Sequence, residues 1–96
     1  MHSVVQSSQA EQDLIDIWVY TAEEWSIVQA DTYLEDLVVG IDRLQEHPMI
    51  GTSRDDLRKG YRALTVSQHL VFYKVSEDEV EIIRVLHKSV DSPRHL

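Results

Sequence analysis

Residues 60–87, GYRALTVSQHLVFYKVSEDEVEIIRVLH, decide the fold of this chain, because their apolar side chains recur at about every second position. That period is typical of strands with one buried face, and it predicts strands at 60–66, 69–75 and 79–87. The connections between them, Ser67-Gln68 and Glu77-Asp78, are too short for a crossover. The three strands are therefore expected to form an antiparallel meander.

Alternation along the strands assigns their side chains to two faces if both connections have an even length. The face expected to pack on the rest of the domain is mostly apolar: Ala63, Thr65, Leu70, Phe72, Ile83 and Val85, with Lys74 opposite Glu81 at its margin. The opposite face mixes aliphatic, aromatic and cationic groups: Arg62, Leu64, Val66, His69, Val71, Tyr73, Ile82, Arg84 and Leu86. A mixed surface of this kind is costly to leave in water, so it suggests a partner.

Upstream of the meander the apolar period is helical, and two capping signatures predict where helices begin. Ser8 with Glu11 forms the first, and Ser26 with Gln29 the second. The first stripe comprises Ala10, Leu14, Ile17, Trp18, Thr21 and Trp25, and both tryptophans are expected in the core. The second comprises Ala30, Tyr33, Leu34, Leu37, Val38, Ile41 and Leu44, and it ends before Pro48. Two amphipathic helices with almost no connection fold back as an antiparallel hairpin.

Three smaller features complete the plan of the chain. Residues 3–6 (SVVQ) are expected to form a short strand, and residues 48–59 form a loop. Gly40, at the edge of the second stripe, is expected to mark a close contact, because glycine costs about 1 kcal/mol against alanine in a helix. The predicted fold is α+β, a single domain over residues 1–96. It has a short N-terminal strand and an antiparallel helix hairpin packed on a three- to four-stranded, mainly antiparallel sheet.

Composition limits the function. The chain has no cysteine, which excludes disulfides and thiolate metal sites and fits a reducing cytoplasm. No secretory signal and no bilayer-spanning segment is recognisable, so a cytoplasmic location is expected. The net charge is −8, and residues 8–47 contain ten acids and one base. Such a chain lacks the concentrated basic surface that binding to nucleic acid requires.

Motifs that carry chemistry are absent from the sequence. The three glycines form no phosphate loop, and the five histidines lack metal-ligand spacing, so neither cofactor nor metal is expected. His87, at the end of the last strand, is interpreted as a structural histidine, or alternatively as a partner contact or general acid/base. Arg62 and Arg84 either pair with acids on their own surface or bind a carboxylate of a partner.

The order of these elements resembles the RelE/ParE toxin superfamily, and the cues are most similar to its ParE branch. In chain order the cues are A-x-x-D-L-x-x-I at 10–17, Y-x-x-x-x-W at 20–25, Q-A-x-x-Y at 29–33, H-P-x-x-G at 47–51, R-x-G-Y-R at 58–62, H-x-x-F-Y at 69–73 and I-I-R-V-L-H at 82–87, followed by Asp91 and His95-Leu96. Together they cover nearly the whole chain. The N-terminal strand departs from the basic and aromatic opening common in the family.

The resemblance implies a non-enzymatic toxin that poisons DNA gyrase by protein binding. It also implies a ParD-like antitoxin from the same operon, with which the toxin forms a hetero-oligomer. Relatives of the RelE type are instead ribosome-dependent mRNA endonucleases, which would here use His87 with Lys88, Arg62 and Arg84. That basic set is incomplete, because Val66 stands where a strand arginine is expected and Arg94 near the place of a tyrosine. A decayed toxin that only binds its antitoxin is the third alternative.

The expected partner-binding residues lie on the mixed face, at the end of the last strand and in the C-terminal segment; the strand-end residue, His87, is by alternation on the helix-facing side. They are Arg62, Tyr73, Arg84, His87, Lys88 and Arg94. By alternation Arg62 and Arg84 share the face away from the helices, and residues 88–96 hold a local excess of positive charge. Trp25 and Tyr33 are expected to help bind an amphipathic segment of the antitoxin.

Overall fold

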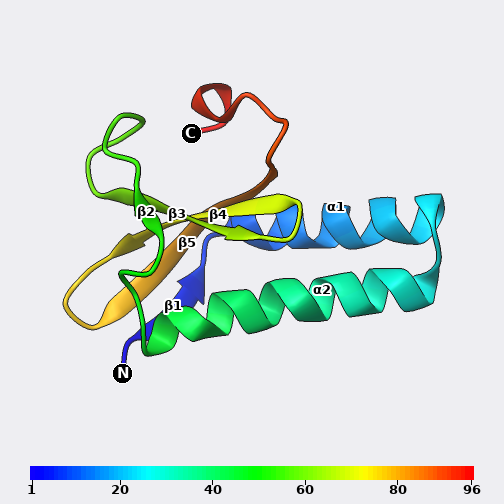
Figure 1. The fold of residues 1–96 in the computed structure, drawn as a ribbon, viewed down its shortest axis with the longest axis horizontal. Helices are drawn as coiled ribbons and strands as arrows, with labels where there is room; N and C mark the ends of the chain where they lie inside the picture. The colour runs from blue at the N-terminus through cyan, green and yellow to red at the C-terminus, as the bar shows by residue number, and fades with distance from the viewer.

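The computed structural model describes residues 1–96 as two helices on a mixed sheet (Figure 1). The elements are β1 (Ser3–Gln6), α1 (Ser8–Glu24), α2 (Ile27–Asp42), η1 (Arg43–Gln45), β2 (Thr52–Ser53), β3 (Tyr61–Val66), β4 (His69–Val75), β5 (Glu79–His87) and η2 (Ser92–Arg94). The predicted α+β class, the helix hairpin and the three-stranded meander are confirmed.

The sheet has five strands in the order β1-β5-β4-β3-β2, rather than the three or four expected. The additional strand, β2, lies within the predicted loop and pairs antiparallel with β3 through Thr52 and Ser53. β1 pairs in parallel with the start of β5, from Ser3 opposite Glu79 to Gln6 opposite Ile82. The strands furthest apart in the sequence are therefore neighbours in the sheet.

Serine side chains cap both helices. Ser26 caps α2 as predicted, since its hydroxyl accepts the backbone N–H of Gln29 at 3.1 Å. The cap of α1 is Ser7 rather than Ser8, and its hydroxyl accepts the N–H of Ala10 at 3.0 Å. The Ser7 hydroxyl also donates to the carbonyl of Ile83, so the cap joins the start of α1 to β5. Ser7 rather than Ser8 thus caps the helix and also makes a contact with a residue distant in the sequence, which the local motif cannot show.

The helices pack on the opposite face of the sheet from the one predicted. The core between them contains Ala10, Leu14, Leu37, Ile41, Leu44, Val71, Tyr73, Val80, Ile82 and Val85. Leu64 and Val66 join it, whereas Ala63, Phe72 and Leu86 form a separate small cluster. The aliphatic members of the predicted partner face other than Leu86 therefore belong to the core under the helices, and each fully buried one contributes about 1.5–3 kcal/mol.

A β-bulge explains why Val85 lies on the helix-facing side with residues that simple alternation placed opposite it. Phe72 pairs with Arg84 but the next residue, Tyr73, pairs with Ile82, so Ile83 is an extra residue in β5. One extra residue exchanges the two faces of a strand from that point on.

The outer face of the sheet is covered by the C-terminal segment. Leu57 and Leu96 pack against the small cluster, and Ser92 is buried. Arg84 donates to the carbonyl of His95 at 3.1 Å, and Arg58 to that of Leu96 at 2.8 Å. The C-terminal segment, which the sequence analysis describes only by its excess of positive charge, is therefore packed on the domain.

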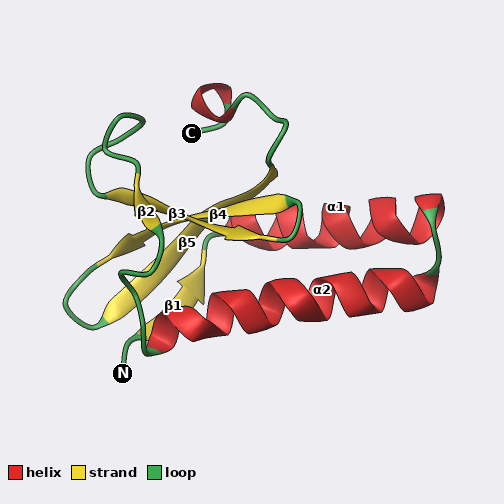
Figure 2. Cartoon of the chain, viewed as in Figure 1, coloured by secondary structure: helices red, strands yellow, loops and turns green.

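Gly40 makes the close contact that its position predicted. A Cβ atom there would lie 2.6 Å from a methyl group of Val66 on β3, so glycine lets α2 approach the sheet. The other end of the hairpin projects beyond the strands (Figure 2). Trp25 lies at this end and is 72% exposed, so its assignment to the core is wrong; Trp18 is half-buried and donates to Asp31. Neither helix has the length and apolar character to cross a membrane.

Candidate functional site

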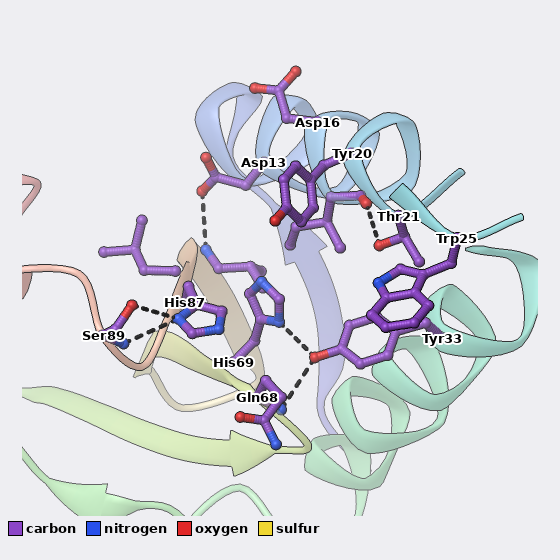
Figure 3. Close-up of a pocket in the computed structure, with 13 residues that line it drawn as sticks. Asp13, Asp16, Tyr20, Thr21, Trp25, Tyr33, Gln68, His69, His87 and Ser89 are labelled. Carbon is purple, nitrogen blue, oxygen red and sulfur yellow. Dashed lines mark hydrogen bonds between the residues drawn. The ribbon is translucent and has the colours of Figure 1, made fainter. Parts of the chain in front are cut away.

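A groove of about 590 Å³ lies between the helix hairpin and the strand ends where β4 begins and β5 finishes (Figure 3). Its wall on one side is α1, and Tyr33 of α2 closes it beside the turn between β3 and β4. The residues that line it are Asp13, Asp16, Ile17, Tyr20, Thr21, Trp25, Tyr33, Gln68, His69, Val85, Leu86, His87 and Ser89.

Asp13 fixes the α1 wall to the sheet. β1 ends opposite Ile82, which leaves the later amides of β5 without a strand partner on that edge. The Asp13 carboxylate accepts the N–H of Val85 at 2.9 Å and two N–H groups of Arg84 at 2.8 Å each. These hydrogen bonds raise the pKa of Arg84 above its usual value. A helix side chain therefore takes over the role of the missing strand.

Tyr33, His69 and His87 form a connected row across the strand ends. The Tyr33 hydroxyl accepts the N–H of Gln68 at 3.0 Å and lies 2.6 Å from Nδ1 of His69, as the dashed lines of Figure 3 show. The rings of His69 and His87 meet edge to face, with centroids 5.3 Å apart. Burial, and next the neighbouring His87, lower the pKa of His69 to about 4. The ring is then neutral near pH 7, and its Nδ1 can accept a hydrogen bond from the Tyr33 hydroxyl.

Exposed aromatic rings line the groove on the side of α1. Tyr20 is 65% exposed, and Trp25 stands even further into solvent. A second hollow of about 390 Å³ shares Thr21, Trp25 and Tyr33 with the first and adds Gln29, Thr32 and Asp36. The two hollows are therefore parts of one continuous surface, which we call the aromatic groove.

The aromatic groove has the character of a binding surface. Its rings are large, stiff and incompletely covered, as in the anchors of protein interfaces. Neither hollow is lined by lysine or arginine, and their formal charges come from aspartates. No group of three or more His, Asp or Glu side chains in the molecule is arranged to hold a metal ion.

Arg62 and Tyr73 hold the loop before β2. Tyr73 is fully buried, donates to the carbonyl of Pro48 at 2.8 Å and accepts the N–H of Gly51 at 2.9 Å. Arg62 pairs with Tyr73 on the neighbouring strand and donates to the carbonyls of Met49 and Gly51 at 3.0 and 2.6 Å. Both side chains are thus engaged within the fold, away from the aromatic groove.

The other predicted residues are dispersed. Arg84 lies across from Phe72, so the expectation that it shares a face with Arg62 is wrong. His87 lies in the groove, and its Nδ1 is 2.7 Å from the Ser89 hydroxyl. Lys88 is exposed, and Arg94 is exposed 3.9 Å from Asp91.

Sequence reasoning missed the groove as a site. Its strongest available signal was the pair His69 and His87, which begin and end the predicted β4–β5 hairpin and therefore face each other at its open end. Nothing in the sequence distinguishes Asp13 and Asp16 from the solvated acidic residues of a helix, and it carries no sign of the edge amide that Asp13 meets. The sequence predicts an antitoxin contact at Tyr33 and Trp25, and both side chains line the groove.

Comparison with known proteins identifies close relatives. Residues 4–91 match the family model described as "ParE toxin of type II toxin-antitoxin system, parDE". The chain is 43% identical to Toxin ParE1 of Caulobacter vibrioides over 90 residues, which are 94% of this chain and 93% of that one.

Two solved structures share the fold. One is a chromosomal ParDE system from P. aeruginosa, with a TM-score of 0.81 at 24% identity, covering 91% of this chain and 96% of the other. The second is the toxin–antitoxin complex RelBE2 of Mycobacterium tuberculosis, with a TM-score of 0.67 at 19% identity, covering 91% and 98%.

Proposed function

The chain belongs to the ParE toxin family of type II toxin–antitoxin systems, and from this we propose that it poisons DNA gyrase by protein binding and is neutralised by a ParD-like antitoxin. The observation that carries the proposal is the family match over residues 4–91, which includes both helices and the whole meander. Membership in a family whose description names the parDE pair supports an antitoxin partner. The gyrase target rests on resemblance to the family.

The aromatic groove supports the binding part of the proposal. Tyr20 and Trp25 expose large apolar rings in the groove, on a chain of net charge −8. An exposed aromatic surface of this kind is typical of interfaces. A protein that acts and is neutralised by binding needs such surfaces.

The endonuclease alternative finds less support. It requires His87, Lys88, Arg62 and Arg84 to act on one RNA segment. Arg62 is bonded to the loop before β2, Arg84 is bonded to Asp13, and the two come from opposite faces of the sheet. The likeness to RelBE2 is one of fold.

The test is to purify the protein and assay it with DNA gyrase for supercoiling and for cleavage complexes, in parallel with an mRNA cleavage assay on ribosomes. We expect that supercoiling is lost, that cleaved DNA accumulates and that mRNA stays intact. The antitoxin should restore the supercoiling activity of gyrase. Cleavage of mRNA that His87→Ala abolishes would establish the endonuclease instead. Antitoxin binding without effect in either assay would identify a decayed toxin.

Within the gyrase assay, Lys88→Ala and Arg94→Ala test the C-terminal segment, because both side chains are exposed and their loss leaves the core intact. A drop of about tenfold in inhibition is expected if either cation contacts an acidic surface of the target, and added salt should reduce the difference. Truncation after Val90 is the weaker test, because it removes the buried Ser92 and uncovers the small cluster around Phe72.

A further inference from the structure

The loop between η1 and β2, residues 46–51, is firmly held and yet shows apolar side chains to solvent; we call it the β2 loop. Met49 is 61% exposed and Ile50 is 41% exposed. The buried Tyr73 hydroxyl fixes the backbone on both sides of them, because it donates to the carbonyl before this pair and accepts the amide after it. The two exposed side chains are therefore presented on a backbone that is already ordered.

Arg62 lies beneath the same loop as a cation without a carboxylate. Its Nη2 donates to the carbonyls of Met49 and Gly51, and it takes part in none of the ion pairs of the molecule. Its Nε is buried without a hydrogen-bond partner, whereas Nη1, also without a partner, is not buried. Neutral carbonyls do not cancel the charge, so the guanidinium still has both a charge and a free donor to offer a carboxylate.

The β2 loop lies in the positively charged part of an acidic molecule. Residues 43–62 contain five of the nine bases of the chain but only three of its seventeen acids. One of these acids, Asp56, is paired with Arg54, and another, Asp55, accepts the N–H of Gly60. In Figure 1 this segment lies at the opposite end of the molecule from the turn between α1 and α2. An acidic partner is therefore attracted to this end and repelled by the rest of the chain.

We propose that the β2 loop is the surface by which the protein contacts its target, with Met49 and Ile50 seated in an apolar recess and Arg62 paired with a carboxylate beside that recess. The proposal rests on the proposed function for the identity of the target. It places the contact apart from the aromatic groove, because no residue of 43–62 lines either hollow.

A protein surface is the occupant that gains from every feature of the β2 loop. Methionine and arginine are enriched at protein interfaces, and a loop that is ordered beforehand loses less entropy when it binds. Nucleic acid would meet Arg62 but would gain nothing from the exposed apolar side chains, and its phosphates are repelled by a chain of net charge −8. A second copy of the chain would bring the same net charge of −8.

The experiment compares two double variants that remove exposed apolar side chains from different places. Met49→Ser with Ile50→Ser alters the β2 loop, and Val28→Ser with Val39→Ser is the matched control on α2, where these valines are 74% and 56% exposed. Arg62→Gln removes the charge but keeps an N–H donor for the loop carbonyls. Each protein is checked by thermal melting, assayed for inhibition of gyrase supercoiling in low and high salt, and titrated with the purified antitoxin by calorimetry.

We expect the β2-loop variant to inhibit gyrase about tenfold more weakly than wild type, while its melting temperature and antitoxin affinity stay those of wild type. The α2 control should match wild type in all three measurements. Arg62→Gln should be about tenfold weaker in low salt, and high salt should narrow the difference. A short fluorescein-labelled DNA duplex, offered without gyrase, should show no binding by fluorescence anisotropy.

Other results would overturn the inference in distinguishable ways. Full inhibition of gyrase by the β2-loop variant would exclude the loop as the target surface and leave the proposed function standing. If wild type itself has no effect on gyrase, the proposed function fails and the loop loses its partner with it. A parallel loss of antitoxin binding would assign the loop to the antitoxin, and binding of the free duplex that Arg62→Gln abolishes would assign it to nucleic acid.

Discussion

Replacing Asp13 with alanine should destabilise the protein more than any other change at an acidic residue. The substitution removes three hydrogen bonds at once and leaves the Arg84 guanidinium and the Val85 amide without their carboxylate. The Arg84 and Asp13 side chains are only 17% and 12% exposed. Breaking a fully buried pair costs about 3–5 kcal/mol, so this nearly buried pair should cost about 3 kcal/mol. That corresponds to a fall in melting temperature of about 12–24 °C for a domain of this size.

The assay is unfolding in urea, monitored by tryptophan fluorescence, of Asp13→Ala, Arg84→Ala and the double variant. Because the two side chains act as one unit, the double variant should be about 2 kcal/mol less damaging than the sum of the single ones. Asp16→Asn, one helical turn away and exposed, is the matched control and should shift stability by less than about 0.5 kcal/mol.

The reasoning would be refuted if Asp13→Ala unfolded within about 0.5 kcal/mol of wild type. Additive effects of the two single substitutions would refute the more specific point that Asp13 stabilises through Arg84. Loss of stability with full additivity would instead assign the whole effect to the Val85 amide.

Three further outcomes are expected. Leu37→Asp should unfold the protein, because the carboxylate would replace a fully buried side chain in the core; a melting curve like that of wild type would contradict the core assignment. Gly51→Ala should cost about 1–3 kcal/mol, because the added Cβ would lie 2.5 Å from the Tyr73 hydroxyl and 2.8 Å from a backbone carbonyl; Tyr73→Phe, measured beside it by the same unfolding assay, should lose the two loop hydrogen bonds without the clash, and an unchanged Gly51→Ala would show that the loop is free to move. Burial, and next the neighbouring His87, lower the pKa of His69 in the folded protein from 6.5 to about 4. Between these two pH values the unfolded chain binds a proton at His69 that the folded chain does not. Stability should therefore fall by about 1–2 kcal/mol as the pH drops from 7 towards 4, discounted because solvent reaches part of the ring, and His69→Gln should remove that part of the slope in unfolding measured at pH 7 and pH 5.

Local patterns were sufficient to predict both helices and the strands β1, β3, β4 and β5, but not the short strand β2. The helical stripes around Leu14 and Leu37 and the period of two after Gly60 depend on residues close in sequence, and all these elements form as expected. Gly40 was also informative, because a glycine inside a helix requires a reason, and Val66 provides it.

The faces of the sheet could not be predicted in the same way. The bulge at Ile83 leaves no mark in composition, yet it changes which side chains of β5 point to the helices. Arg62 was read as a surface cation because nothing nearby in sequence shows the loop carbonyls that it binds. Trp25 was placed in the core because its spacing continues the α1 stripe, although the hairpin has by then extended beyond the strands.

The parallel pairing of β1 with β5 has a consequence for how the protein is made. Residues 3–6 find their sheet partners only in residues 79–82. The hydrogen bonds of the Ser7 hydroxyl to Ile83 and of Asp13 to Val85 likewise require the last strand. A chain emerging from the ribosome can form the α1–α2 hairpin early, but it cannot close its sheet until most of its length has been released. Contacts of such long sequence separation slow folding. A toxin with this topology gives a co-expressed antitoxin an interval in which the hairpin is exposed and the finished domain does not yet exist.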